Sequence, residues 1–130
     1  MSSTTKGLVK ESVSQAHLEP APLDPADVVD GDPQAASAIL RQSADLTLQN
    51  GIWECTPGTF YLPHNYEETV TILEGRVTVT PEGGEPMDIE AGDTAFFEAG
   101  ARVLWQVHDT VRKSWHIYDE TGTVFAAPEE

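Results

Sequence analysis

The chain has 130 residues, of which 39% are hydrophobic and 22% are charged, ordinary values for one folded domain that argue against wholesale disorder. It carries 7 lysine and arginine residues against 22 aspartate and glutamate residues, a formal net charge of −15, so its surface repels phosphate backbones and anionic lipid. We therefore expect neither nucleic acid nor a membrane as a partner.

The single cysteine, Cys55, cannot form an intramolecular disulfide, and we interpret it as a small buried hydrophobic residue. No apolar run approaches the roughly 18 residues of a membrane-spanning helix. The N-terminal sequence MSSTTKGLVKESVSQ also lacks the apolar stretch of a signal peptide. Together these features predict a cytoplasmic protein.

The first 32 residues are polar and then punctuated by proline, and they lack the period of 2 or 3.6 that would bury one face. We interpret 1–32 as an N-terminal arm, either partly disordered or packed on a partner, and 33–130 as the folded domain. Asp32 precedes Pro33, and proline suits the first position of a helix, so a short helix is predicted over AASAILRQ (35–42).

From about Ala44 to Asp119, short β-branched and aromatic runs alternate with turn residues, which is typical of an all-β sandwich or barrel. Apolar and polar residues alternate from Val77 to Thr80, just before the tip PEGGEP (81–86), and they alternate again from Met87 to Ile89, just after it. This pattern predicts a β-hairpin. Further runs are TAFF (94–97), VLWQVH (103–108) and SWHIYD (114–119).

The segment HNYEETVTILEGRVTVT (64–80) resembles the first conserved motif of cupins, G-x5-H-x-H-x3–4-E-x6-G. Six residues separate Glu68 from Gly75, His64 falls at the second histidine position, and Leu62 falls at the first. Another register makes His64 the first histidine and Tyr66 the second, but it disturbs the spacing before Glu68.

The second cupin motif, G-x5-P-x-G-x2-H-x3-N, is recognisable at GDTAFFEAGARVLWQV (92–107). Gly92 and Gly100 are correctly separated, whereas Glu98, Val103 and Val107 replace the proline, histidine and asparagine. The resemblance implies a cupin fold, an antiparallel β-barrel of the jelly-roll kind, with its core at about 44–119 and an extended N-terminal arm.

Three further stretches, GIWECTPGTF, ILEGRVTVTPEGGEP and WQVHDTVRKSWHIYD, are similar to single-domain cupins related to (S)-ureidoglycine aminohydrolase, a family that includes proteins of ethanolamine utilisation. That resemblance implies an enzyme acting on a small nitrogenous metabolite. The family's manganese ligands would be Glu, His, His and Gln at positions 62, 64, 68 and 103, and only His64 matches. Neither the manganese site nor the aminohydrolase chemistry therefore carries over.

Alternate residues of a strand share a face, so Phe60, Leu62 and His64 point one way, and Glu68 shares a face with Val70. If the apolar members mark the inside, His64 and Glu68 both face the barrel interior, where cupins hold their metal. A buried structural pair and a metal-free acid–base pair both remain open for these two residues.

A histidine and a carboxylate form half a site for a divalent transition metal, whereas a catalytic zinc site has three protein ligands. His64, Glu68 and His116 are the candidate metal ligands, although the pattern does not decide which face of its strand His116 occupies. Because Leu62 and Val103 stand at ligand positions, we expect no cofactor, with a divalent metal as the alternative if His116 points inward.

The predicted function is small-molecule binding by a cupin with a degenerate metal site, and whether it is an enzyme stays open. The alternative is an enzyme of the ureidoglycine aminohydrolase kind, metal-dependent if His116 completes the site. The predicted ligand pocket combines a polar end with apolar walls: His64, Glu68, Phe60, Leu62, Val103 and Trp105. We also expect a homodimer whose arm, through Leu8 and Val9, packs on the neighbouring barrel, and Arg112 and Lys113 are placed at a dimer contact.

Overall fold

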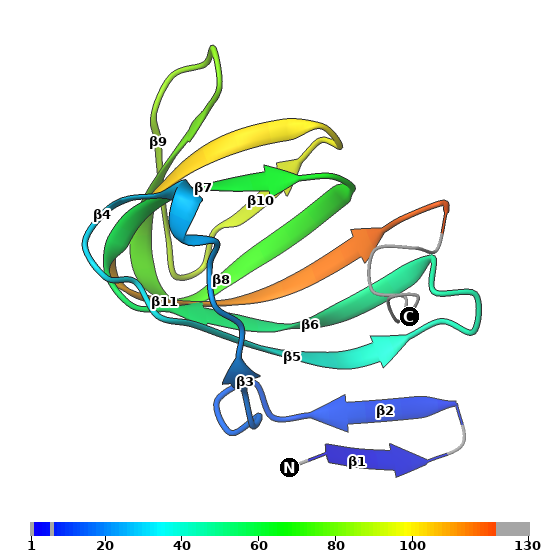
Figure 1. The fold of residues 1–130 in the computed structure, drawn as a ribbon. Coiled ribbons are helices and arrows are strands. Elements are labelled where there is room, and N and C mark those ends of the chain that lie inside the picture. Colours follow the sequence, from blue (N-terminus) through cyan, green and yellow to red (C-terminus); the bar gives the residue numbers. More distant parts are fainter. Residues whose placement is uncertain (1, 6, 122–130) are drawn as a thin grey trace.

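The computed structural model describes residues 2–5 and 7–121 of the chain. Within this part a nine-stranded antiparallel sheet curls into a barrel (Figure 1), which confirms the predicted all-β cupin fold. Its strands are β3 (Glu19–Pro20), β4 (Val28–Asp30), β5 (Ala35–Gln42), β6 (Leu48–Cys55), β7 (Gly58–His64), β8 (Glu67–Pro81), β9 (Met87–Glu90), β10 (Thr94–Phe97) and β11 (Ala101–Tyr118). No helix in the described ranges is long and apolar enough to cross a membrane.

Two long strands, β8 and β11, organise the barrel. β11 pairs with β8 along most of its length, while its other edge pairs first with β7 and then with β6. Register shifts between Val107 and Lys113 bend this pair, as bulges do. At the bend Gly75 has a φ of 89°, and a Cβ there would collide with the carbonyl oxygen of Thr110, so the last glycine of the first cupin motif lets the two backbones meet.

The interior is filled by alternate residues of the barrel strands, as the period of 2 requires. The predicted hairpin is confirmed, because Val77 pairs with Ile89 and Val79 with Met87 across the tip. The run 103–108 and residues 114–118 of the second run belong to the single strand β11 rather than to two separate strands. The buried core includes Phe60, Val70, Ile72, Val77, Val103, Trp105, Val107, Val111, Trp115 and Ile117.

The helix predicted over 35–42 is wrong, because these residues form strand β5. β5 pairs with β6 on one edge and with β3 on the other, and Ala35 enters the core. As a helix, this segment would leave the backbone groups along the edge of β6 without partners. Pairing with the neighbouring strands thus overrides the local preference.

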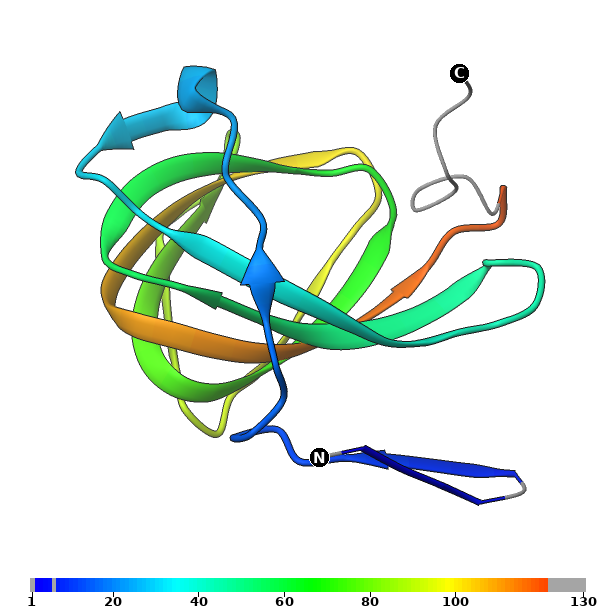
Figure 2. The same cartoon turned by 60° about the horizontal axis from the view of Figure 1, so that its bottom comes forward.

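The predicted arm is only partly separate from the barrel. Its strands β3 and β4 pair with β5 and β7, with the short 3₁₀ helix η1 (Pro25–Asp27) between them. By contrast β1 (Ser2–Thr5) and β2 (Leu8–Glu11) form their own two-stranded sheet, which stands apart from the barrel in Figures 1 and 2. Residues 122–130, at the end of the predicted domain, lie outside the described residues.

Candidate functional site

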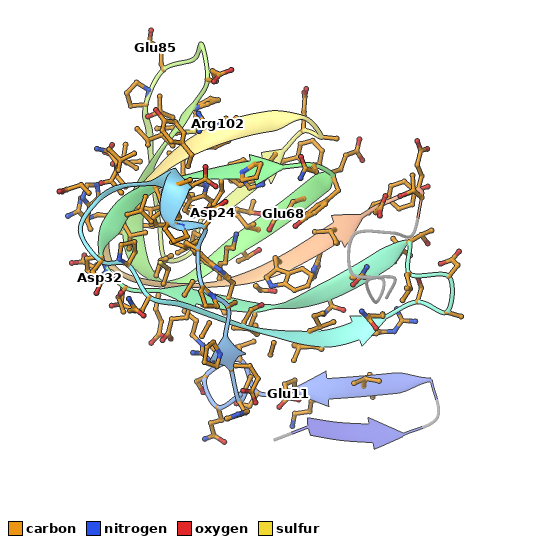
Figure 3. All side chains as sticks on the ribbon, viewed as in Figure 1. Glu11, Asp24, Asp32, Glu68, Glu85 and Arg102 are labelled. Carbon is orange, nitrogen blue, oxygen red and sulfur yellow. The ribbon has the colours of Figure 1, made fainter. Side chains whose placement is uncertain are left out.

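A cavity of about 630 Å³ is lined by residues of β5, β6, β7, β8 and β11, by Tyr66 and by the segment 19–21. Strand β7 contributes Leu62 and His64, and β8 contributes Glu68, because these residues have the inward parity of their strands. Figure 3 shows Glu68 among the barrel strands, whereas Glu85 and Glu11 lie at the periphery.

Aromatic and aliphatic side chains make up most of the cavity wall. Trp53 of β6, Trp115 of β11, Leu62 and Tyr66 all line it. Trp115 lies across Gly51, where a Cβ would overlap the indole ring. A glycine at this position is therefore required for Trp115 to reach the cavity.

The polar end of the cavity is a chain of three buried side chains from three strands. His64 Nδ1 lies 2.9 Å from Glu68 Oε1, and Lys113 Nζ donates to Glu68 Oε2 at 3.3 Å. His64 is 2% exposed, Glu68 is 6% exposed and Lys113 is 4% exposed. A buried charge requires a partner, and here the carboxylate serves both the imidazole and the ammonium.

The Lys113 ammonium also lies 4.7 Å from the ring centroids of both Trp53 and Trp105. Aromatic faces attract a cation, and the attraction grows where water is excluded. Two indole faces and one carboxylate therefore fix this charge inside the barrel.

Glu68 is ionised under all ordinary conditions. Burial on its own would raise the pKa of this carboxyl, but the Lys113 ammonium and the hydrogen bond with His64 outweigh it and lower the pKa to about 2. Burial beside the Glu68 charge also raises the pKa of Tyr66 to about 12, so the phenol stays neutral.

His64 is held by packing as well as by its hydrogen bond. Its ring stacks on Phe97 with centroids 4.2 Å apart and an angle of 4° between the planes. In the described part of the chain, two buried side-chain nitrogens have no hydrogen-bond partner, His64 Nε2 and Trp105 Nε1. Buried polar atoms nearly always have partners, so these two nitrogens mark places where a water or a bound molecule would supply the missing partner.

The residues present do not fit a resident metal ion. His116 is exposed on the outer face of β11, so the structure does not bring it together with His64 and Glu68. Residues 2–5 and 7–121 contain no group of three or more His, Cys, Asp or Glu that could hold a metal. Both Glu68 oxygens are already engaged, one of them by the ammonium of Lys113.

The six residues of the predicted pocket separate into two groups. Leu62, His64 and Glu68 line the cavity. Phe60, Val103 and Trp105 do not line it, since they are fully buried in the core at 0%, 1% and 0% exposure. The predicted pocket was therefore placed too deep in the barrel.

Lys113 is the residue of this site that the sequence patterns did not identify. It and Arg112 were predicted at a dimer contact, but both are buried and ion-paired within their own chain. The signal that identifies Lys113 is its parity with Trp115 and Ile117, the buried residues two and four positions further along β11.

Cys55 is buried and free, as predicted for a small hydrophobic residue. Burial raises the pKa of its thiol to about 12, despite the opposing charge of Lys113. A thiol in this environment stays protonated and unreactive.

The EutQ-like cupin domain matches residues 42–115, more than half of the chain. Among solved structures, a protein of unknown function of the DUF861 family from Pseudomonas syringae pv. tomato is 33% identical, with a TM-score of 0.72. It covers 79% of this chain, and this chain covers 45% of it, less than half its length. No curated protein matches the chain.

Two structures with lower identity share the fold. An ethanolamine utilization protein Q from Salmonella typhimurium is 22% identical with a TM-score of 0.75, and the match covers 91% of this chain and 92% of that one. The EutQ protein of Clostridium difficile is 18% identical with a TM-score of 0.68, covering 88% and 90%. With the match over residues 42–115, the chain belongs to the EutQ-like cupin family.

Proposed function

We propose that this cupin binds a small organic molecule in the 630 Å³ cavity without the help of a metal ion. The observation that carries the proposal is the Lys113 ammonium, which contacts Glu68 in the barrel interior, where the predicted metal would have been held. A lysine fixed inside the barrel supplies a positive charge there without the protein ligands that a metal ion would need.

The cavity suits a molecule with an apolar body and one polar end. The apolar body would lie against Trp53, Leu62 and Trp115, and the polar end would meet His64 and Lys113. Ligand pockets commonly combine apolar walls with a few convergent polar groups, which fix the orientation of the ligand.

The finer likeness to (S)-ureidoglycine aminohydrolase gains no support from the geometry. A metal-dependent enzyme of that kind required His116 as a third ligand, and His116 is exposed on the outer face. We therefore do not favour it over metal-independent binding.

The test is a thermal-shift screen of tag-free protein against small amines, ureides and carbonyl compounds, with and without a chelator. A ligand at about 100 times its Kd adds roughly 2.7 kcal/mol of stability, a Tm rise of several degrees for a chain of this size. We expect at least one saturable shift that the chelator does not change.

Leu62→Trp, which fills the cavity, should abolish the shift, and Leu48→Trp is the matched control. Leu48 is 52% exposed on β6 and does not line the cavity, so the added bulk there should leave binding unchanged. Equal binding by the wild type and Leu62→Trp, or a shift that requires a metal, would contradict the proposal.

A further inference from the structure

The two ring nitrogens of His64 have different surroundings. Nδ1 lies 2.9 Å from Oε1 of Glu68, which is ionised. An ionised carboxylate can only accept hydrogen bonds, so the proton of the neutral imidazole is on Nδ1. The other nitrogen, Nε2, then carries a lone pair.

This lone pair is buried and unused by the protein. Nε2 has no hydrogen-bond partner among the described residues, and His64 lines the cavity. Stacking on Phe97 and the bond to Glu68 fix the orientation of the ring, so Nε2 cannot turn toward another protein group. Nε2 itself is buried, so a bound molecule reaches this basic atom only when side chains of the cavity wall move aside.

We infer that His64 is a general base, which removes a proton from the molecule bound in the cavity, and that Glu68 is its positioning residue. The inference rests on the binding function proposed above. A carboxylate that holds one imidazole nitrogen while the other faces a substrate is the arrangement that makes histidine an efficient base in hydrolases.

Lys113 indicates the class of substrate. Its ammonium lines the same cavity and is 4% exposed, so it can stabilise negative charge that develops on a bound molecule. A small carbonyl compound with an acidic C–H bond next to the carbonyl matches a base and a cation in one apolar cavity.

The proton transfer balances without any further reagent. The C–H bond breaks, its proton forms an N–H bond at Nε2 of His64, and the electron pair stays on the substrate as an enolate. Return of the proton to a different carbon yields an isomer, and return to the same carbon exchanges the hydrogen with solvent. Neither outcome needs an oxidant or a second substrate.

Other ionisable groups from several elements line the cavity with His64. They are Glu68 from β8, Lys113 from β11, Tyr66 between β7 and β8, and Glu19 from β3. Glu68 remains ionised and Tyr66 neutral around neutrality, because their pKa values are about 2 and about 12.

The first test is nitrogen-15 NMR of the histidine rings in the full-length protein, which requires no substrate. We expect the neutral ring of His64 to carry its proton on Nδ1 and a lone pair on Nε2. A proton that stays on Nε2 from about pH 6 to about pH 9, or a lone pair on Nδ1, would overturn the inference.

The second test uses 5-nitrobenzisoxazole, which opens to a coloured phenolate once a base removes its ring C–H proton. We expect the wild type to exceed His64→Gln by about 100-fold, within the usual range for a positioned base. Glu68→Gln should shift the pH profile, since it removes the carboxylate that fixes the tautomer. His116→Gln, an exposed histidine on β11, is the matched control and should react as the wild type does.

Binding and chemistry fail in distinguishable ways. If the probe binds saturably and His64→Gln opens it as fast as the wild type, the base role is overturned and the binding proposal stands. If neither the probe nor the screened compounds bind, both are overturned. The NMR experiment uses the wild-type protein, so it decides the question even if a variant fails to fold.

Discussion

Arg112 and Lys113 are neighbours on β11, and their side chains point to opposite sides of the barrel wall. Both cations are nearly excluded from water, at 8% and 4% exposure. Lys113 points inward to Glu68, and Arg112 forms an ion pair of 2.7 Å with Glu54 on β6. The two residues therefore allow a direct comparison of buried charge on the two faces of one strand.

The outer cation is engaged by groups of its own chain. Besides Glu54, Arg112 donates from Nε to the carbonyl of Val13 at 2.7 Å and from Nη2 to that of Ala16 at 3.4 Å. It thus ties the segment after β2 to the barrel wall. The inner cluster differs, because His64 Nε2 remains without a partner beside a cavity. Unused polar atoms, rather than buried charge itself, distinguish the candidate site from the anchor.

The largest effect is expected from Lys113→Met, which keeps the length of the side chain and removes its charge. The Glu68 carboxylate would then be buried without its cation, a change that typically costs 3–5 kcal/mol of unfolding free energy. Urea denaturation at neutral pH measures it.

The double variant Lys113→Met/Glu68→Leu is the control for this change, because it removes both charges. We expect it to recover much of the lost stability, as replacing a buried ion pair with apolar residues often does. Equal stability of Lys113→Met and the wild type would show that the inner ion pair contributes nothing.

The second-largest effect is expected from acid, which should weaken the inner cluster of His64, Glu68 and Lys113. Lys113 and His64 lower the pKa of Glu68 from 4.5 to about 2, against the effect of burial. The stabilisation from this carboxylate is therefore complete above about pH 4.5 and is lost as the pH falls toward 2. Its full size is about 3 kcal/mol, since each pKa unit corresponds to about 1.4 kcal/mol.

Urea denaturation from about pH 5 to about pH 2, with Glu68→Gln beside the wild type, isolates this contribution. Asp45 is the comparison residue, because hydrogen bonds from Thr47 and Ser43 lower its pKa to about 2 as well, although it is fully exposed. If the pH dependence of the unfolding free energy survives in Glu68→Gln and disappears in Asp45→Asn, the effect belongs to Asp45 and not to Glu68.

Arg112→Ala tests the outer anchor and should have a smaller effect, about 1.5–3 kcal/mol for hydrogen bonds that involve a charged group. Because its partners are the carbonyls of Val13 and Ala16, the loss should also appear as faster hydrogen exchange or proteolysis around 13–16. Arg112→Lys should not restore protection, since a lysine has no planar set of donors. Unchanged exchange in both variants would exclude the anchor.

Much of the inner site was predictable because strand periodicity is local. The spacing from Glu68 to Gly75, with the parity of Phe60 and Leu62, placed His64 and Glu68 inside the barrel, as they are in the structure. Lys113 was not predicted, because 103–108 and 114–119 read as separate runs. In the structure both runs are part of β11, where Lys113 shares the inward parity of Trp115 and Ile117, and His116 has the opposite parity.

Features that depend on which segments of the chain lie beside one another were harder to predict. Strand β5 contains Ala, Leu, Arg and Gln, which suit a helix, and becomes a strand because β6 and β3 lie beside it. The same holds for Arg112, whose partners lie on β6 and in the arm, 58 and 96 to 99 residues away along the chain. No local pattern contains that information.

The smallest effect on barrel stability is expected from removing residues 1–11, which contain the hairpin β1–β2 beyond the Arg112 anchor. An isolated two-stranded sheet is marginal in water, and Leu8 and Val9 on β2 are 61% and 46% exposed, so this hairpin needs a partner. The homodimer stays a prediction, and the net charge of −15 opposes it unless the apolar contact outweighs the repulsion. We expect light scattering to show a dimer for the full chain, favoured by added salt, and a monomer of nearly unchanged urea stability for the chain that begins at Ser12. A monomeric full chain would exclude the dimer, and a dimer that survives the deletion would assign the contact to the barrel instead of the hairpin.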